Sequence, residues 1–68
     1  MTVARVTEIK ASSPKSFDAA IKEGVARAHK TLKNVRSAWI YDQEILFGGD
    51  GQISEYRVRM KVTFVLTD

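Results

Sequence analysis

The clearest pattern in the sequence is a strict alternation of apolar and polar side chains near its C-terminal end. The apolar members are Tyr56, Val58, Met60, Val62, Phe64 and Leu66, and the polar members are Glu55, Arg57, Arg59, Lys61 and Thr63. A period of two places the two sets on opposite faces of a β-strand, because successive side chains of a strand point to opposite sides. The segment therefore predicts a strand with one apolar face that a second layer must cover.

The covering layer is predicted to be one amphipathic helix over residues 14–33. Apolar or small residues recur there at steps of three and four and form a single stripe of Phe17, Ile21, Gly24, Val25, Ala28 and Leu32. Ser13 followed by Pro14 is a helix-start signal, because a serine hydroxyl can cap a free amide and proline loses no hydrogen bond at the first helical position. Asn34 suits the left-handed position after the helix, with Val35 packing back as its hydrophobic contact.

Two further strands complete the predicted fold. Residues 3–9 mix β-branched and charged side chains at period two, and residues 37–47 are rich in β-branched, aromatic and aliphatic side chains. The Gly-Gly-Asp-Gly sequence at 48–51 predicts a tight turn, because glycine and aspartate tolerate positive φ angles. The order is β-α-β-β, an α+β fold in which a three-stranded antiparallel sheet wraps one helix if the first strand pairs with the third. We expect one domain over residues 1–68.

The second predicted strand carries more apolar surface than one helix can cover. Its large apolar residues occupy both faces, with Ala38, Ile40 and Leu46 on one and Trp39, Tyr41, Ile45 and Phe47 on the other. The chain has only 68 residues, no cysteine and one histidine, so it lacks the disulfides and the usual zinc sites that stabilise many small proteins. We therefore expect copies of the chain to associate and cover the surplus.

The length of the hairpin loop decides which side chains share a face with the core. An odd-length loop places Ala38 with the core side chains of the third strand and puts Trp39 beside its basic residues on the opposite face, whereas an even-length loop reverses this. We favour the odd-length loop. With this loop, Asp42 and Glu44 lie on the same side as Ala38, so their carboxylates would face the core. A β-bulge near the end of the second strand would turn them away from it.

Composition and charge exclude several classes of protein. A content of 44% hydrophobic and 28% charged residues is typical of a folded globular chain. The first residues lack the apolar run of a signal peptide and no window approaches the ~18 apolar residues of a membrane span, so we expect a cytoplasmic protein without a membrane partner. No nucleophile with a neighbouring base and no phosphate-binding loop is present at a useful spacing, so we do not expect an enzyme.

Two blocks of the sequence resemble the dodecin family. They are residues 12–35, SSPKSFDAAIKEGVARAHKTLKNV, and residues 55–66, EYRVRMKVTFVL, in the order and spacing of the family. The resemblance covers nearly the whole chain and implies a hollow, roughly spherical homododecamer that binds or stores a small ligand. In flavin-binding dodecins, a tryptophan early in the second strand covers the flavin ring and a glutamine on the third strand bonds its polar edge.

The resemblance does not extend to those two residues. The tryptophan position falls on Ser37 and the glutamine position falls on Arg57. Trp39 lies two residues further along, on the same strand face and about 7 Å away. We therefore predict a site for flavin (FMN, FAD or riboflavin) formed by Ser37, Trp39, Arg57 and Arg59. Trp39 is either a stacking platform for the ring or an anchor between subunits.

The same strands offer other kinds of site. Asp42 and Glu44 share a face and, with symmetry mates, would supply oxygen ligands for calcium, which some dodecin-like proteins without the flavin tryptophan bind; structural ion pairs are the alternative. The row of Arg57, Arg59 and Lys61 would hold a phosphate-bearing ligand, or else be solvated or ion-paired beside the aromatic residues of the second strand. A small nucleic-acid-binding module using this row is a further alternative, disfavoured because assembly would cover the row.

Overall fold

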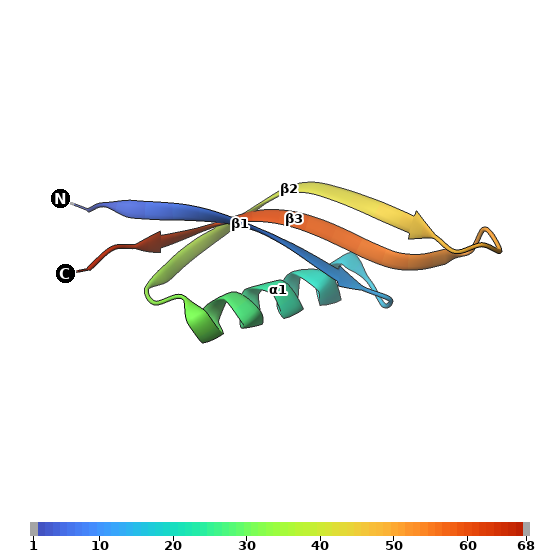
Figure 1. Cartoon of the computed structure of the whole chain (residues 1–68), viewed down its shortest axis with the longest axis horizontal. Helices are drawn as coiled ribbons and strands as arrows, with labels where there is room; N and C mark the ends of the chain where they lie inside the picture. The colour runs from blue at the N-terminus through green and yellow to red at the C-terminus, as the bar shows by residue number, and fades with distance from the viewer. Residues whose placement is uncertain (1, 68) are drawn as a thin grey trace.

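A computed structural model describes residues 2–67 of the chain. In order, the chain forms strand β1 (Ala4–Ser13), helix α1 (Phe17–Thr31), strand β2 (Val35–Phe47) and strand β3 (Ile53–Val65). The strands form one antiparallel sheet in the order β1-β3-β2, and α1 lies along one of its faces (Figure 1). The predicted α+β fold, with the first strand paired to the third, is confirmed.

Helix α1 begins later than predicted. Ser16 is its N-cap: this residue is extended, and its hydroxyl accepts a hydrogen bond of 3.0 Å from the backbone N–H of Ala19. Ser13 belongs to β1, and its hydroxyl accepts a hydrogen bond from the N–H of Lys15 within the connecting turn. The predicted cap at Ser13 is therefore wrong. Two serines three residues apart both fit the cap signal, and the strand pairing of the first leaves the second as the cap.

Strand β1 and helix α1 also end at residues other than those predicted. β1 continues past Ile9, because Ser12 still pairs with Arg57 of β3, and this tertiary pairing overrides the weak strand preference of the local sequence. α1 ends at Thr31 rather than at 33, and Asn34 adopts the predicted left-handed conformation with φ 60°. Within residues 2–67, no helix has the length and apolar character needed to cross a membrane.

The core lies between α1 and the sheet and is small. Its buried apolar side chains are Ala20, Ala28, Val58, Met60 and Val62. The residues from β3 are the even-numbered ones that the alternation predicted. Helix and sheet approach closely at Gly24, where an added Cβ would lie 2.9 Å from Cε of Met60 and 3.0 Å from Cβ of Ala11. A side chain at this helix position would collide with the centre of the core.

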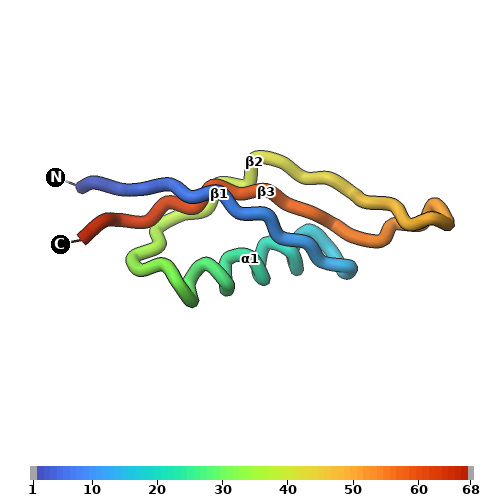
Figure 2. The backbone as a smooth tube through the Cα atoms, viewed as in Figure 1, coloured from blue at the N-terminus to red at the C-terminus, as the bar shows by residue number. Residues whose placement is uncertain are grey.

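The sheet is much longer than the helix that covers it. The Cα trace extends 52 Å along its longest axis, whereas a 15-residue helix spans ~22 Å at 1.5 Å per residue. The β2–β3 hairpin projects past one end of α1, and the paired ends of β1 and β3 project past the other (Figures 1 and 2). Exposed large apolar side chains occur along the sheet at Val3, Val6, Trp39, Ile45, Phe47, Ile53 and Leu66. The predicted surplus of apolar surface is confirmed, but the predicted faces of Ile45 and Leu46 are wrong: Ile45 pairs with Tyr56 on the helix side of β3, and Leu46 pairs with Glu55 on the opposite side.

A β-bulge in β2 decides which side chains lie on each face. Up to Ile40, β2 pairs with β3 in the register that an odd-length loop predicts, with Ala38 and Ile40 on the side of α1. The register then shifts between Ile40 and Asp42, so that Tyr41 is the extra residue of the bulge. Beyond it, Asp42 and Glu44 pair with arginines of β3 on the opposite face. The bulge keeps the two carboxylates off the core side, as predicted, although it lies in the middle of the strand rather than near its end.

Candidate ligand-binding face

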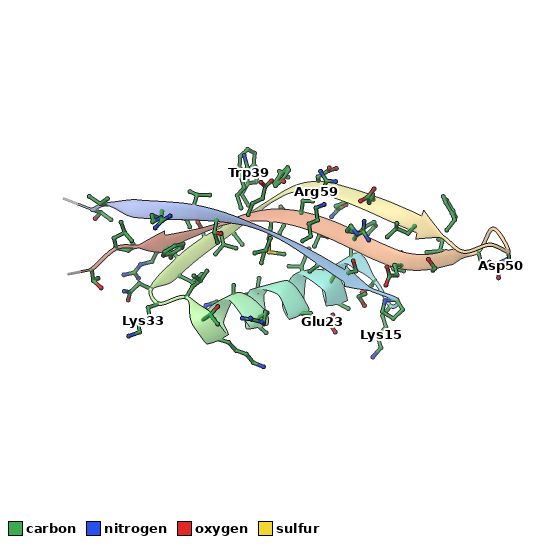
Figure 3. The ribbon with its side chains drawn as sticks, viewed as in Figure 1. Lys15, Glu23, Lys33, Trp39, Asp50 and Arg59 are labelled. Carbon is green, nitrogen blue, oxygen red and sulfur yellow. The ribbon has the colours of Figure 1, made fainter. Side chains whose placement is uncertain are left out.

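The outer face of the sheet, which we define as the face away from α1, collects every residue predicted to bind a ligand or a metal. On β2 and β3 the outer-face pairs are Ser37 with Thr63, Trp39 with Lys61, Asp42 with Arg59 and Glu44 with Arg57. β1 contributes Glu8, Lys10 and Ser12, which pair with Lys61, Arg59 and Arg57. Figure 3 shows Trp39 projecting from the sheet on the side opposite α1. Three of these cross-strand rows carry charged residues of β3, and each is named here by that residue: the Arg57 row, the Arg59 row and the Lys61 row.

The Arg57 row is satisfied within the chain. Nη1 of Arg57 lies 3.5 Å from Oε1 of Glu44, and Nε donates a hydrogen bond of 3.3 Å to Oγ of Ser12. The row therefore pairs one cation with one carboxylate and engages the guanidinium on both sides. Partly exposed pairs of this kind contribute about 1 kcal/mol or less to stability.

The Arg59 row is not satisfied in the same way. Nη1 of Arg59 lies 3.9 Å from Oδ2 of Asp42, which is a long ion pair. Nε of Arg59 is buried and has no hydrogen-bond partner among residues 2–67. On the other side of Arg59, the directly paired residue is Lys10, which carries the same charge. The row thus holds two cations, one carboxylate and one unpaired buried donor, and such a donor costs ~1–3 kcal/mol.

The Lys61 row carries the aromatic groups of the face. Nζ of Lys61 lies 5.4 Å from the ring centroid of Trp39 and 5.2 Å from that of Tyr41. The two rings are 6.1 Å apart and inclined at 57°. The predicted arrangement of a basic side chain beside both aromatic residues is confirmed, and each contact is worth ~0.5–1 kcal/mol at an exposed site. Trp39 remains 64% exposed, so much of the indole surface is available to another molecule.

Sequence reasoning missed two members of this face. Lys10 and Ser12 lie beyond residue 9, where the first strand was predicted to end. The missed signal is the period-two spacing of Glu8, Lys10 and Ser12, which continues the strand pattern into the serine-rich segment. Their contribution depends on the β1–β3 register, because each of them stands directly opposite a basic residue of β3.

The carboxylates predicted for calcium are ion-paired in the single chain. Asp42 and Glu44 face Arg59 and Arg57. Residues 2–67 contain no group of three or more histidine, aspartate or glutamate side chains placed to hold a metal ion. Calcium takes six to eight oxygen ligands, so a site built on these two residues needs carboxylates or carbonyls from other copies of the chain.

One helix on one face of a three-stranded antiparallel sheet, in the order β-α-β-β, defines a class of small α+β proteins. Comparison with known proteins then gives the family: the Dodecin model matches residues 3–67, and the chain belongs to the dodecin family. The calcium dodecin of Mycobacterium tuberculosis is 33% identical over 64 residues, which are 94% of this chain and 89% of that protein.

Solved structures agree with this assignment. Dodecin from Streptomyces davaonensis superposes with a TM-score of 0.92 and 37% identity, covering 98% of this chain and 97% of that one. The structure of the Mycobacterium tuberculosis calcium dodecin, described as having a novel calcium-binding site, gives a TM-score of 0.85 and 31% identity over 96% of this chain and 91% of that one.

Proposed function

We propose that this dodecin forms a cytoplasmic homododecamer that binds or stores a small planar ligand, flavin by resemblance, and catalyses no reaction. The observation that carries the proposal is the position of Trp39. Trp39 is 64% exposed, and its side chain lies on the outer face next to Ser37 and to the basic residues of β3. An exposed indole beside cationic donors suits a flat ring with a polar edge once a neighbouring subunit excludes water.

The proposed assembly is supported by the distribution of apolar surface. The buried core is confined to the segment of the sheet beneath α1, while Phe47 at the hairpin is 68% exposed and Val6 on the outer face is 60% exposed. Apolar surface of this extent marks an interface between proteins. A chain of this size also gains much of its stability from association.

The proposed ligand contacts differ from those implied by the family resemblance. At the tryptophan position, Ser37 offers no ring, so Trp39 provides the stacking surface in a site displaced along β2. At the glutamine position, Arg57 already bonds Ser12 and Glu44, so Arg59 is the better placed donor for the polar edge of a ligand.

A fluorescence titration with riboflavin tests this proposal. Riboflavin carries the flavin ring without a phosphate, and its emission is quenched when the ring stacks on an indole. We expect progressive quenching that saturates at micromolar protein. Riboflavin whose emission stays unchanged in the same concentration range would contradict flavin binding. Protein unfolded in urea is the control for non-specific quenching.

Calcium is a second candidate ligand, favoured by the relationship to the calcium dodecin of Mycobacterium tuberculosis. In this proposal Asp42 and Glu44 supply oxygens from each of several copies, and calcium displaces the arginines that pair with them. Calorimetric titration of the assembled protein with calcium is expected to show saturable heat that the double variant Asp42→Asn, Glu44→Gln loses. The variant Glu23→Gln, which removes an exposed carboxylate of α1, is the matched control. No heat with the unmodified protein would rule this candidate out.

A further inference from the structure

The Arg59 row differs from its two neighbours in how its charges are balanced. In the Arg57 row, one guanidinium is engaged by a carboxylate and by a hydroxyl. In the Lys61 row, the ammonium group lies against two aromatic rings, with Glu8 as its partner position on β1. In the Arg59 row, Lys10 and Arg59 are direct cross-strand partners, and Asp42 is their only acidic partner in the register. The middle of the outer face therefore has an excess of one positive charge.

The incomplete hydrogen bonding of Arg59 indicates which chemical group would bind beside it. The distance to Asp42 is 3.9 Å, so the carboxylate does not engage the guanidinium closely. Nε is buried and has no acceptor among residues 2–67. The Arg59 side chain as a whole is 39% exposed, so an oxyanion bound between Lys10 and Arg59 would accept from the accessible end of the guanidinium and from the ammonium group of Lys10, and would relieve the repulsion between the two cations. Carboxylate and phosphate oxygens fit the planar donor fork of arginine best.

The Arg59 row also lies directly beside the aromatic surface. Arg59 and Lys61 are successive outer-face residues of β3, about 7 Å apart along the strand, and Trp39 is the cross-strand partner of Lys61. A molecule whose ring stacks on Trp39 therefore has Arg59 within the length of a short side chain. Figure 3 shows both labelled residues on the same part of the sheet.

We propose that Lys10 and Arg59 form an oxyanion site beside Trp39, so that this dodecin selects a planar ligand carrying a phosphate or carboxylate group over its uncharged counterpart. This inference rests on the proposed function, because it takes Trp39 to be the stacking surface. The resemblance to flavin-binding dodecins implied no position for the anionic group of the ligand. The inference places this group beside Arg59 and Lys10, and Lys10 belongs to no site predicted from the sequence.

Parallel titrations with FMN and riboflavin test the inference. The two compounds share one ring system and differ in a phosphate group. We expect the dissociation constant of FMN to be about tenfold or more below that of riboflavin at low salt, because charge-assisted hydrogen bonds to the phosphate are added. Raising the sodium chloride concentration to ~0.5 M is expected to reduce this ratio, since salt screens the partly exposed charges.

Variants separate the site from the overall charge of the protein. Lys10→Gln is expected to bring the FMN to riboflavin ratio close to one while riboflavin affinity stays within about twofold. Arg59→Gln is expected to lower the ratio in the same way and also to weaken riboflavin binding, because Arg59 is a proposed donor to the polar edge of the ring. Arg59→Lys keeps the charge but removes Nε, and is expected to retain part of the preference. Lys30→Gln removes one exposed positive charge from α1 and is the matched control, with an unchanged ratio.

The outcomes distinguish this inference from the function on which it rests. If neither compound is bound, the proposed function fails. If both bind with equal affinity, the flavin site stands and the oxyanion site is wrong. If Arg59→Gln leaves the ratio unchanged but reduces the assembled mass in native mass spectrometry, the acceptor of Nε belongs to a neighbouring copy, and the inference is again overturned.

Discussion

Replacing Met60 by alanine is expected to lower the free energy of unfolding by about 2–5 kcal/mol. Met60 is fully buried at the centre of β3, and its thioether arm fills the space beneath Gly24 of α1. Alanine would leave a cavity where helix and sheet approach most closely, and Gly24 has no side chain to fill it. Domains of this length have total stabilities of roughly 3–10 kcal/mol, so the variant is expected to lose a large part of its stability.

Urea unfolding followed by circular dichroism, at one fixed protein concentration, measures this effect. Met60→Leu conserves most of the volume and is expected to cost less than ~1.5 kcal/mol, so it serves as the control. A Met60→Ala midpoint within experimental error of the unmodified protein would mean that the core does not lie between Gly24 and β3.

Replacing Trp39 by alanine is expected to weaken riboflavin binding by roughly ten- to a hundredfold. Stacking of a flat base on an aromatic side chain contributes ~1–3 kcal/mol, and neither Ser37 nor Arg59 offers a ring in its place. Trp39 is 64% exposed and lies outside the core of the single chain. The measurement is the riboflavin quenching titration.

Trp39→Phe is the graded control, because it keeps a smaller ring on the outer face and should retain intermediate affinity. Equal quenching by the alanine variant and the unmodified protein would show that the flavin ring stacks elsewhere. A lower assembled mass of the alanine variant would identify Trp39 as a subunit anchor, which was the alternative role predicted from the sequence.

The sequence predicted the layers of the fold because each layer leaves a periodic signal. Burial of only one face of β3 produces a strict alternation, and burial of one stripe of α1 produces steps of three and four. The start of α1 was misplaced because Ser13 and Ser16 are both chemically able to cap a helix. Only the pairing of β1 with β3 decides between them, and that pairing is a long-range contact.

Which residues share the candidate site was harder to predict from the sequence than the layers of the fold. Simple parity along β2 separates Asp42 and Glu44 from Trp39, whereas the bulge at Tyr41 brings all three to the outer face. A bulge was expected, but its position depends on the local register with β3, which no residue type specifies. This shift makes the carboxylates partners of Arg57 and Arg59, and it leaves Arg59 with the weaker of the two ion pairs.

The proposed ligand site depends on copies of this chain covering one another's apolar surface. Native mass spectrometry of the purified protein at low micromolar concentration tests it most directly. We expect one dominant species of about twelve times the 7.6 kDa chain mass, with bound ligand visible as an increment on that mass. A folded species at 7.6 kDa that persists at this concentration would overturn both the proposed assembly and the ligand site between subunits.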